Sequence, residues 1–239
     1  RINDATKHAS EALDLFQKRD DPRGVTEMKL LRSTIACDVG DWDGAASALN
    51  GLNTDSVANE EQTSILAWRR GEIAFGRGDL KAALAGADEA IAGAQKAHSF
   101  GTELSARLLR ARALSRKRNT STEAARELAS VRTGVARYAS VPLRLALAET
   151  ELVVAPNKGA AIYREARALL ARLPAYGRAF RIHTLGVDAL RRTGGEGIDD
   201  ALRAVNASYA SLHDSTPAAQ RAALADLAAS TGLKPTVVP

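Results

Sequence analysis

The chain has 239 residues, of which 45% are hydrophobic, 4% aromatic and 26% charged. This length allows one or two ordinary domains, or one elongated repeat array. The composition excludes an intrinsically disordered chain, because the apolar share is large enough to bury a core. It also excludes a core built mainly on aromatic rings, so Ala, Leu, Ile and Val must fill the interior. Such small side chains favour helices that approach one another closely.

The net charge of +5 is unevenly distributed along the chain. Residues 1–100 contain 12 Lys and Arg against 16 Asp and Glu, giving −4, whereas residues 101–239 contain 21 against 12, giving +9. A basic C-terminal half attracts an acidic protein surface or nucleic acid. The alternative is a solvated, arginine-rich helical surface that binds nothing.

The single cysteine, Cys37, excludes a disulfide framework or a cysteine-based metal site within one chain. It lies in an apolar helical run, which predicts a buried structural thiol. No apolar run approaches the roughly 20 residues that a membrane-spanning helix needs, and no signal peptide is visible. We therefore expect a cytoplasmic protein without membrane insertion. Because the chain begins with Arg1 and not with Met, we expect it to be a fragment of a larger protein.

Apolar residues at three-and-four spacing predict a series of helices in the N-terminal half. The first ends at a turn that contains Pro22 and Gly24, two residues that interrupt helices. A loop is expected at 53–58, and Asn59 followed by Gln62 predicts the cap of the next helix. The predicted helices are 2–18, 25–39, 42–52, 60–77 and 80–99.

The same pattern continues to the end of the chain, and no segment shows the strict apolar–polar alternation of a strand. Thr120 and Glu123 form a capping box, and Pro142 suits the first turn of a helix. The predicted helices are 102–118, 123–138, 142–154, 160–173, 178–192, 198–212 and 217–230. The tail, 233–239, carries two prolines and should be extended or disordered. The chain is therefore expected to be all-α, with sequential antiparallel hairpins.

The segment 64–97 shows the clearest internal pattern, because two helical arms are joined there by a short polar turn at 76–79. Small residues stand where the arms would meet, at Gly71 in the first arm and at Ala83 and Ala90 in the second. With Gly78 in the turn, this small-residue pattern resembles the tetratricopeptide repeat, a helix–turn–helix unit of about 34 residues.

Looser copies of the pattern occur along most of residues 2–212. Their small or turn positions are Gly40-Asp41 and Ala45, then Ser105 and Leu108, then Ala161 and Ala168, and finally Gly186, Ala189 and Ala201. Residues 11–49 also look like the divergent repeats of bacterial regulatory proteins. Trp68 and Phe75 have the mutual spacing of the repeat's aromatic positions, but they lie one residue late relative to Gly71. A generic α-solenoid or an irregular helical bundle is the structural alternative.

The resemblance implies an α-solenoid of about five antiparallel helix–turn–helix repeats, forming one domain over 1–232 with a C-terminal capping helix. In this family the first helices line a concave surface that holds a peptide or a partner domain. The resemblance therefore implies a non-catalytic protein-binding scaffold or regulatory module of a larger signalling protein. The alternative is a ligand-sensing or nucleic-acid-associated regulatory domain that uses the basic C-terminal half.

The first candidates for partner binding lie on the first arm of segment 64–97. Trp68, Glu72 and Phe75 share one helical face, with Arg69 beside them. Trp and Phe are effective anchors when they are exposed in a groove, and the alternative is that both rings are ordinary core. The corresponding candidates in the fifth copy are Phe180, His183 and Arg191.

A basic run lies in the predicted helix 102–118. Its members spread around much of the helix circumference, and no aromatic residue alternates with them, so stacking on nucleic-acid bases is unsupported. An acidic protein partner and plain solvation are the other interpretations. The run consists of Arg107, Arg110, Arg112, Arg116, Lys117 and Arg118.

Catalytic and cofactor motifs are missing from the sequence. The chain contains no G-x-S-x-G, phosphate-loop or H-E-x-x-H pattern, and Gly76-Arg77-Gly78 follows no predicted strand, as a dinucleotide fingerprint would require. The four histidines lack the spacing of metal ligands; they are His8, His98, His183 and His213. We expect no enzymatic activity, no cofactor and no metal ion.

Overall fold

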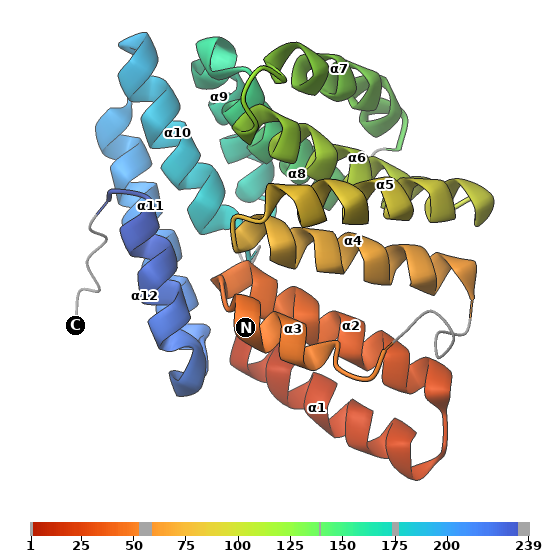
Figure 1. The fold of residues 1–239 in the computed structure, drawn as a ribbon. Helices are drawn as coiled ribbons and strands as arrows, with labels where there is room; N and C mark the ends of the chain where they lie inside the picture. The colour runs from red at the N-terminus through yellow and green to blue at the C-terminus, as the bar shows by residue number, and fades with distance from the viewer. Residues whose placement is uncertain (1, 53–58, 139, 174–176, 234–239) are drawn as a thin grey trace.

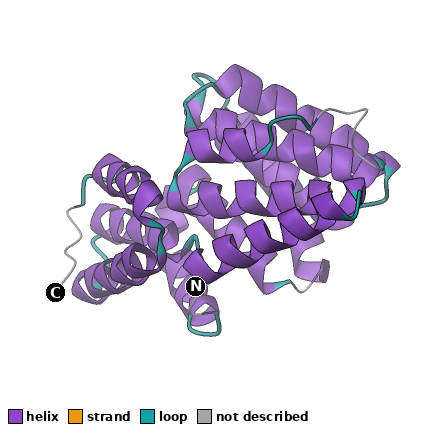
Figure 2. Ribbon diagram, turned by 90° about the horizontal axis from the view of Figure 1, so that it is seen from below, coloured by secondary structure: helices purple, strands orange, loops and turns teal. Residues whose placement is uncertain are grey.

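The structure is a computed structural model that describes residues 2–52, 59–138, 140–173 and 177–233. The predicted loop at 53–58 and nearly all of the predicted tail lie outside the described residues. Within the described ranges every regular element is a helix, which confirms the all-α prediction (Figures 1 and 2). None of the described helices is long and apolar enough to cross a membrane.

Twelve α-helices follow one another in the described residues, with short 3-10 helices at Pro156–Lys158 and Ala218–Gln220. Their bounds agree with the predicted ones to within a few residues. The helices are α1 Ile2–Lys18, α2 Pro22–Val39, α3 Trp42–Ala48, α4 Glu60–Gly76, α5 Leu80–Lys96, α6 Phe100–Arg116, α7 Ser121–Tyr138, α8 Val141–Val154, α9 Gly159–Leu170, α10 Ala179–Thr193, α11 Ile198–Ser215 and α12 Arg221–Ser230.

Aspartate and asparagine caps determine where several helices begin. The predicted cap at Asn59 is confirmed, because its Oδ1 accepts from the Gln62 amide at 2.9 Å. Asp21 caps α2 and places Pro22 in the first turn, where a missing N–H costs nothing, so α2 begins three residues earlier than expected. Asp41 and Asp79 cap α3 and α5 in the same way.

The close contact predicted between the two arms of segment 64–97 is confirmed. Ala83 and Ala90 of α5 are fully buried, and a Cβ atom added to Gly71 of α4 would lie 3.2 Å from the Ala83 carbonyl oxygen. Gly86, also on α5, faces the same contact: its Cβ would lie 2.9 Å from the Gly71 Cα. Only small residues allow the two backbones to pack at this separation.

Helices that follow each other in the chain pack together, and the last helices also return to the first ones. Helix α11 contacts α1, and α12 contacts α2. Figures 1 and 2 show α10–α12 gathered to one side of α1–α5. The Gln220 amide donates to the Asp41 carboxylate at 3.1 Å, and Leu227 packs on Gly40. The C-terminal helix therefore covers part of the N-terminal half.

The largest apolar core lies between α8 and α12, around the fully buried side chains of Tyr163, Phe180 and Leu224. Smaller clusters connect α2–α4 and α6–α8. Elsewhere buried alanines fill the space between helices, as the low aromatic content requires.

The contact at Gly86 gives a direct test of the packing. We expect Gly86→Ala to lower the free energy of unfolding by about 1–3 kcal/mol, because the new methyl group meets the backbone of α4 and cannot be accommodated by a side-chain rotation. Urea unfolding followed by circular dichroism measures this change. Gly101→Ala is the matched control, because its new Cβ would lie 3.5 Å from its nearest neighbour, an ordinary contact. An equal loss of unfolding free energy in both variants would contradict the explanation that the new methyl group clashes with α4.

Candidate functional site

A network of charged side chains lies inside the molecule, between alternate helices of the chain. Asp38 comes from α2, Glu72 from α4, Arg112 from α6 and Glu149 from α8, while Arg178 directly precedes α10. With Arg69 of α4, these residues form the inner ion cluster. Its members are far apart in sequence, because Arg178 lies 140 residues after Asp38 and 106 after Glu72.

Glu72 is the centre of the inner ion cluster. Its carboxylate accepts from Arg69 Nη1 at 2.5 Å, from Arg178 Nη2 at 2.6 Å and from Arg112 Nη2 at 3.4 Å. Its side chain is only 5% exposed. Burial alone would raise the pKa of Glu72, but the three guanidinium groups outweigh this effect and hold its pKa well below the usual range of a glutamate. The carboxylate is therefore ionised and fixed in place.

Glu149 and Asp38 complete the network around the same arginines. Arg112 Nη1 donates to Glu149 Oε1 at 3.3 Å, and Arg178 Nη1 lies 3.7 Å from the other carboxylate oxygen. Arg178 Nε donates to Asp38 Oδ1 at 3.2 Å. Buried charges are tolerated when they are paired, so the inner face of these helices can be polar although the molecule has a hydrophobic core elsewhere.

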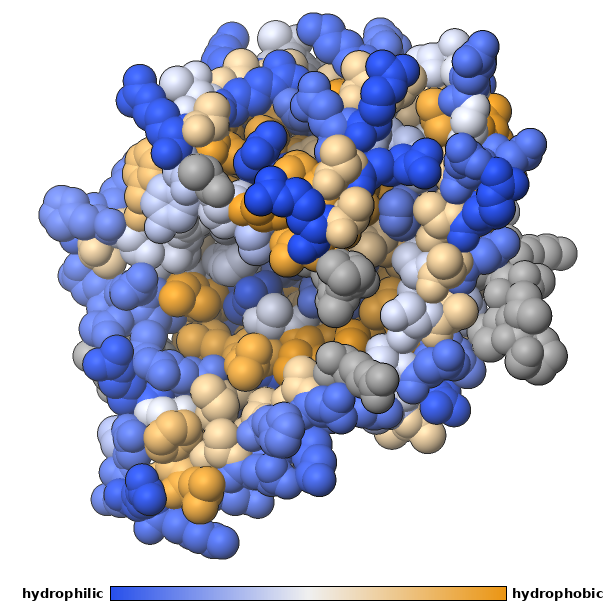
Figure 3. Space-filling model, turned by 180° about the vertical axis from the view of Figure 1, so that it is seen from behind, coloured by the Kyte–Doolittle hydropathy of each residue, from blue (hydrophilic) through white to orange (hydrophobic). Residues whose placement is uncertain are grey.

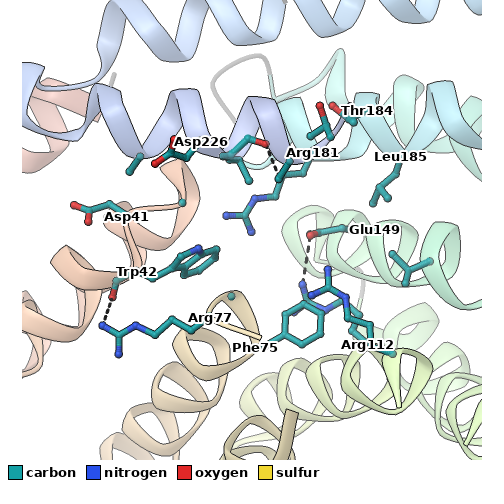
Figure 4. A pocket seen from close by; sticks show the side chains of 18 of the residues that line it. Asp41, Trp42, Phe75, Arg77, Arg112, Glu149, Arg181, Thr184, Leu185 and Asp226 are labelled. Atoms are coloured by element: carbon teal, nitrogen blue, oxygen red, sulfur yellow. Dashed lines mark hydrogen bonds and ion pairs between the residues drawn. The ribbon is translucent and has the colours of Figure 1, made fainter. Parts of the chain in front are cut away.

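Two hollows open on either side of the inner ion cluster, and Arg112 lines both. The Trp68 hollow, about 550 Å³, is lined by Trp68, Arg69, Leu108, Tyr138, Leu143 and Arg178 among others. The Arg181 cavity, about 710 Å³, is lined by Trp42, Phe75, Arg112, Arg116, Arg181 and Leu227 among others (Figure 4). The space-filling view from behind also shows a depression where hydrophobic and polar side chains meet (Figure 3).

The candidate residues on α4 divide between these places. Trp68 is half-buried in the wall of its hollow, with the Arg69 guanidinium 4.0 Å from its ring centroid. Phe75 is also half-buried but faces the Arg181 cavity. Arg69 and Glu72 are buried and paired with each other, so neither offers a free charge to a partner.

The candidates on α10 do not form a common surface. Phe180 is completely buried and packs against Tyr209, with ring centroids 5.4 Å apart. His183 is half-buried and hydrogen-bonded to the Tyr163 hydroxyl at 2.9 Å. Burial, with the nearby charge of Arg167, lowers the pKa of His183 to about 4, so its imidazole is neutral at physiological pH. Arg191 is exposed at the end of the helix.

The basic run on α6 is divided among several environments. Arg107 pairs with Glu103 and Glu127, at 2.9 and 3.0 Å. Arg110 pairs with Asp88 and Glu127, both at 2.8 Å. Arg112 belongs to the inner ion cluster, and Arg116 faces the Arg181 cavity. Lys117 and Arg118 are exposed beyond the helix end. The run is therefore not one continuous basic surface.

The described residues give little support for a metal site or for a reactive cysteine. They contain no group of three His, Cys, Asp or Glu side chains arranged to hold a metal ion. Cys37 is buried as predicted, and burial, reinforced by the charge of Glu72, raises the pKa of its thiol to about 12. Such a thiol is protonated at physiological pH and is a poor nucleophile.

Sequence reasoning did not identify several residues of this site. Asp38, Glu149, Arg178, Arg181 and Trp42 were not among the candidates, because each looks like an ordinary surface or core residue in its own helix. One signal was available in the spacing: Arg112 follows Glu72 by 40 residues, and Glu149 follows Arg112 by 37. A charged residue therefore recurs at about the length of one helical hairpin.

Comparisons with protein-family models, with curated proteins and with solved structures give no match to this chain. Its function must therefore be inferred from its own geometry.

Because Glu72 is the centre of the cluster, replacing its carboxylate by an amide should lower the stability of the protein strongly. We expect Glu72→Gln to lower the free energy of unfolding by about 3 kcal/mol or more, because three buried guanidinium groups lose their shared counter-charge. Urea unfolding at neutral pH measures this loss of stability. The control is Glu11→Gln, which removes an exposed pair with Lys7 and should change stability by less than about 0.5 kcal/mol. Equal stability of the two variants would refute this role.

The lowered pKa of Glu72 also predicts how its contribution depends on pH. Because its pKa is lower in the folded than in the unfolded chain, its stabilisation is complete above the unfolded value of about 4.3 and is lost as the pH falls below it. The stability difference between wild type and Glu72→Gln should be constant above about pH 5.5 and shrink in more acidic solution. Urea unfolding at several pH values measures this difference, and a difference that grows toward acid would contradict the assignment.

Proposed function

We propose that the chain is a non-catalytic interaction module, a tetratricopeptide-like array of about five helical hairpins that binds a peptide segment of a partner protein in the Trp68 hollow. The array would act as a regulatory part of a larger signalling protein. The observation that carries the proposal is that Trp68 lines an open hollow of about 550 Å³ and is not sealed in the apolar core.

The repeat interpretation is supported by the regular use of alternate helices. Helices α2, α6 and α8 each direct one charged side chain to the inner ion cluster, α4 directs two, and Arg178 adds another from the start of α10. In a stack of helical hairpins the first helix of each unit faces the same side. The recurrence of the inner charge at 40 and 37 residues fits such a stack with variable turns.

The chemistry of the Trp68 hollow favours an apolar anchor on the partner. Tyr138 at its edge is 50% exposed, and Phe100, whose ring centroid lies 6.0 Å from that of Tyr138, is 47% exposed. Aromatic side chains beside a hollow are typical of binding hot spots. The charged groups of the hollow, Arg69, Glu72 and Arg178, are already paired with one another. Binding should therefore tolerate salt.

The nucleic-acid alternative has less support from the same residues. Nucleic-acid binding depends on several free cations that follow the phosphate backbone. Arg107 and Arg110 are held by Glu103, Glu127 and Asp88. The first two members of the basic run are therefore not free to follow a phosphate backbone.

A selection from a library of displayed peptides on the immobilised protein tests the proposal. We expect the enriched peptides to share an aromatic or aliphatic anchor and to bind the Tyr138→Ala variant at least about tenfold more weakly, because a truncated anchor contact costs more than ~1.4 kcal/mol. Fluorescence anisotropy with a labelled copy of the best peptide, at low and high salt, gives both dissociation constants.

Leu15→Ala is the matched control for this experiment. Leu15 on α1 is 56% exposed and lines neither hollow, so its loss should leave peptide binding unchanged. A selection that enriches no peptide would refute the proposal. So would peptides that bind Tyr138→Ala as tightly as wild type, or that dissociate when salt is added.

A further inference from the structure

Three arginines face the Arg181 cavity from two helices. Arg112 and Arg116 are four residues apart on α6 and therefore lie on the same side of that helix. Arg181 extends from α10 toward the middle of the cavity, as Figure 4 shows. Guanidinium groups from separate parts of the chain therefore line one cavity.

These guanidinium groups are incompletely compensated. The Nε atoms of Arg112 and Arg181 are buried and have no hydrogen-bond partner in the described part of the structure. The Arg112 side chain is only 8% exposed. Arg181 donates from Nη2 to the Cys37 carbonyl, but no carboxylate of the described residues lies within ion-pair distance of Arg181 or Arg116. Buried donors without partners are expensive, and two of them on residues that line one cavity favour the binding of an acceptor there.

Repulsion between like charges adds to this cost. The pKa of Arg116 is lowered by partial burial and then by the charges of Arg112 and Arg181. Burial also lowers the pKa of Arg181, although the charge of Glu149 acts in the opposite direction. Holding these cations close together costs free energy, and an anion among them would lower that cost.

The carboxylates that line the same cavity have other roles. Glu149 pairs with Arg112 and Arg178. The others have their own contacts or are exposed: Asp41 caps α3, Asp43 pairs with Arg77, Asp188 pairs with Arg192, and Asp226 is exposed on α12. Because these carboxylates share the lining with the three arginines, the cavity disfavours long polyanions and suits a small anion.

Two aromatic rings complete the cavity. The Phe75 ring centroid lies 4.1 Å from the Arg116 guanidinium carbon and 5.4 Å from that of Arg112. The Trp42 ring lies 5.2 Å from the Arg181 guanidinium carbon. Figure 4 shows Trp42 and Phe75 entering the cavity from different sides. The volume of about 710 Å³ is in the range of small-molecule sites.

We propose that the Arg181 cavity binds a small organic anion, whose carboxylate or phosphate group is held by Arg112, Arg116 and Arg181 and whose planar or apolar part lies between Trp42 and Phe75. This site is distinct from the Trp68 hollow, because Phe75, Arg116 and Arg181 do not line that hollow and Arg112 is the proposed anion ligand that lines both. Charge-assisted contacts from arginine are well suited to both anionic groups.

Isothermal titration calorimetry with four probes tests the proposal: phenyl phosphate, phenylacetate, inorganic phosphate and uncharged benzyl alcohol. We expect at least one of the two aromatic anions to bind, benzyl alcohol not to bind, and Arg116→Gln to weaken binding at least about tenfold. Arg116 is exposed enough for its variant to fold. The preferred probe also distinguishes a phosphate ligand from a carboxylate ligand.

Two control variants each remove one positive charge, as the test variants do. Arg118→Gln changes an exposed arginine two residues from Arg116 and is the control for Arg116→Gln. Arg191→Gln changes an exposed arginine on α10 and is the control for Arg181→Gln. Both controls should bind like wild type, whereas Phe75→Leu should weaken the aromatic anions but not inorganic phosphate. The proposal is overturned if no anion binds, if benzyl alcohol binds as well as the aromatic anions, or if Arg118→Gln weakens binding as much as Arg116→Gln.

Discussion

The structure depends on one buried carboxylate, Glu72, and on the arginines that surround it. A glutamate in the interior must have counter-charges close by, or its burial would outweigh the packing that encloses it. The counter-charges here come from the same helix, from α6 and from the start of α10. The ion pairs therefore require distant hairpins to converge, and they connect the C-terminal half of the chain to α2 and α4.

Small residues and buried charges have complementary roles in this arrangement. Alanines and glycines let consecutive helices such as α4 and α5 approach closely, which concentrates apolar contact between neighbours. The inner sides of the alternate helices are then left to polar side chains. Members of the inner ion cluster also line the two hollows, and Arg112 lines both.

The two hollows differ in the ligands that they suit. The Trp68 hollow has exposed aromatic side chains at its edge and charges that are already paired, so it favours an apolar anchor of a partner. The Arg181 cavity has guanidinium groups with unused donors beside two aromatic rings, so it favours a small anion.

The sequence by itself determined the helices and one close contact between two of them. Local rules place caps such as Asn59, and the small residues around Gly71 predict the packing of α4 on α5, because both depend on neighbours in the chain. Only the tertiary structure decided the roles of the charged residues. Arg112 and Arg116 look alike in the sequence, yet Arg112 is buried and paired in an ion cluster, whereas Arg116 is exposed at the end of the same helix. The path of the whole chain brings Glu149 of α8 and Arg181 of α10 near them, and no local pattern encodes this path.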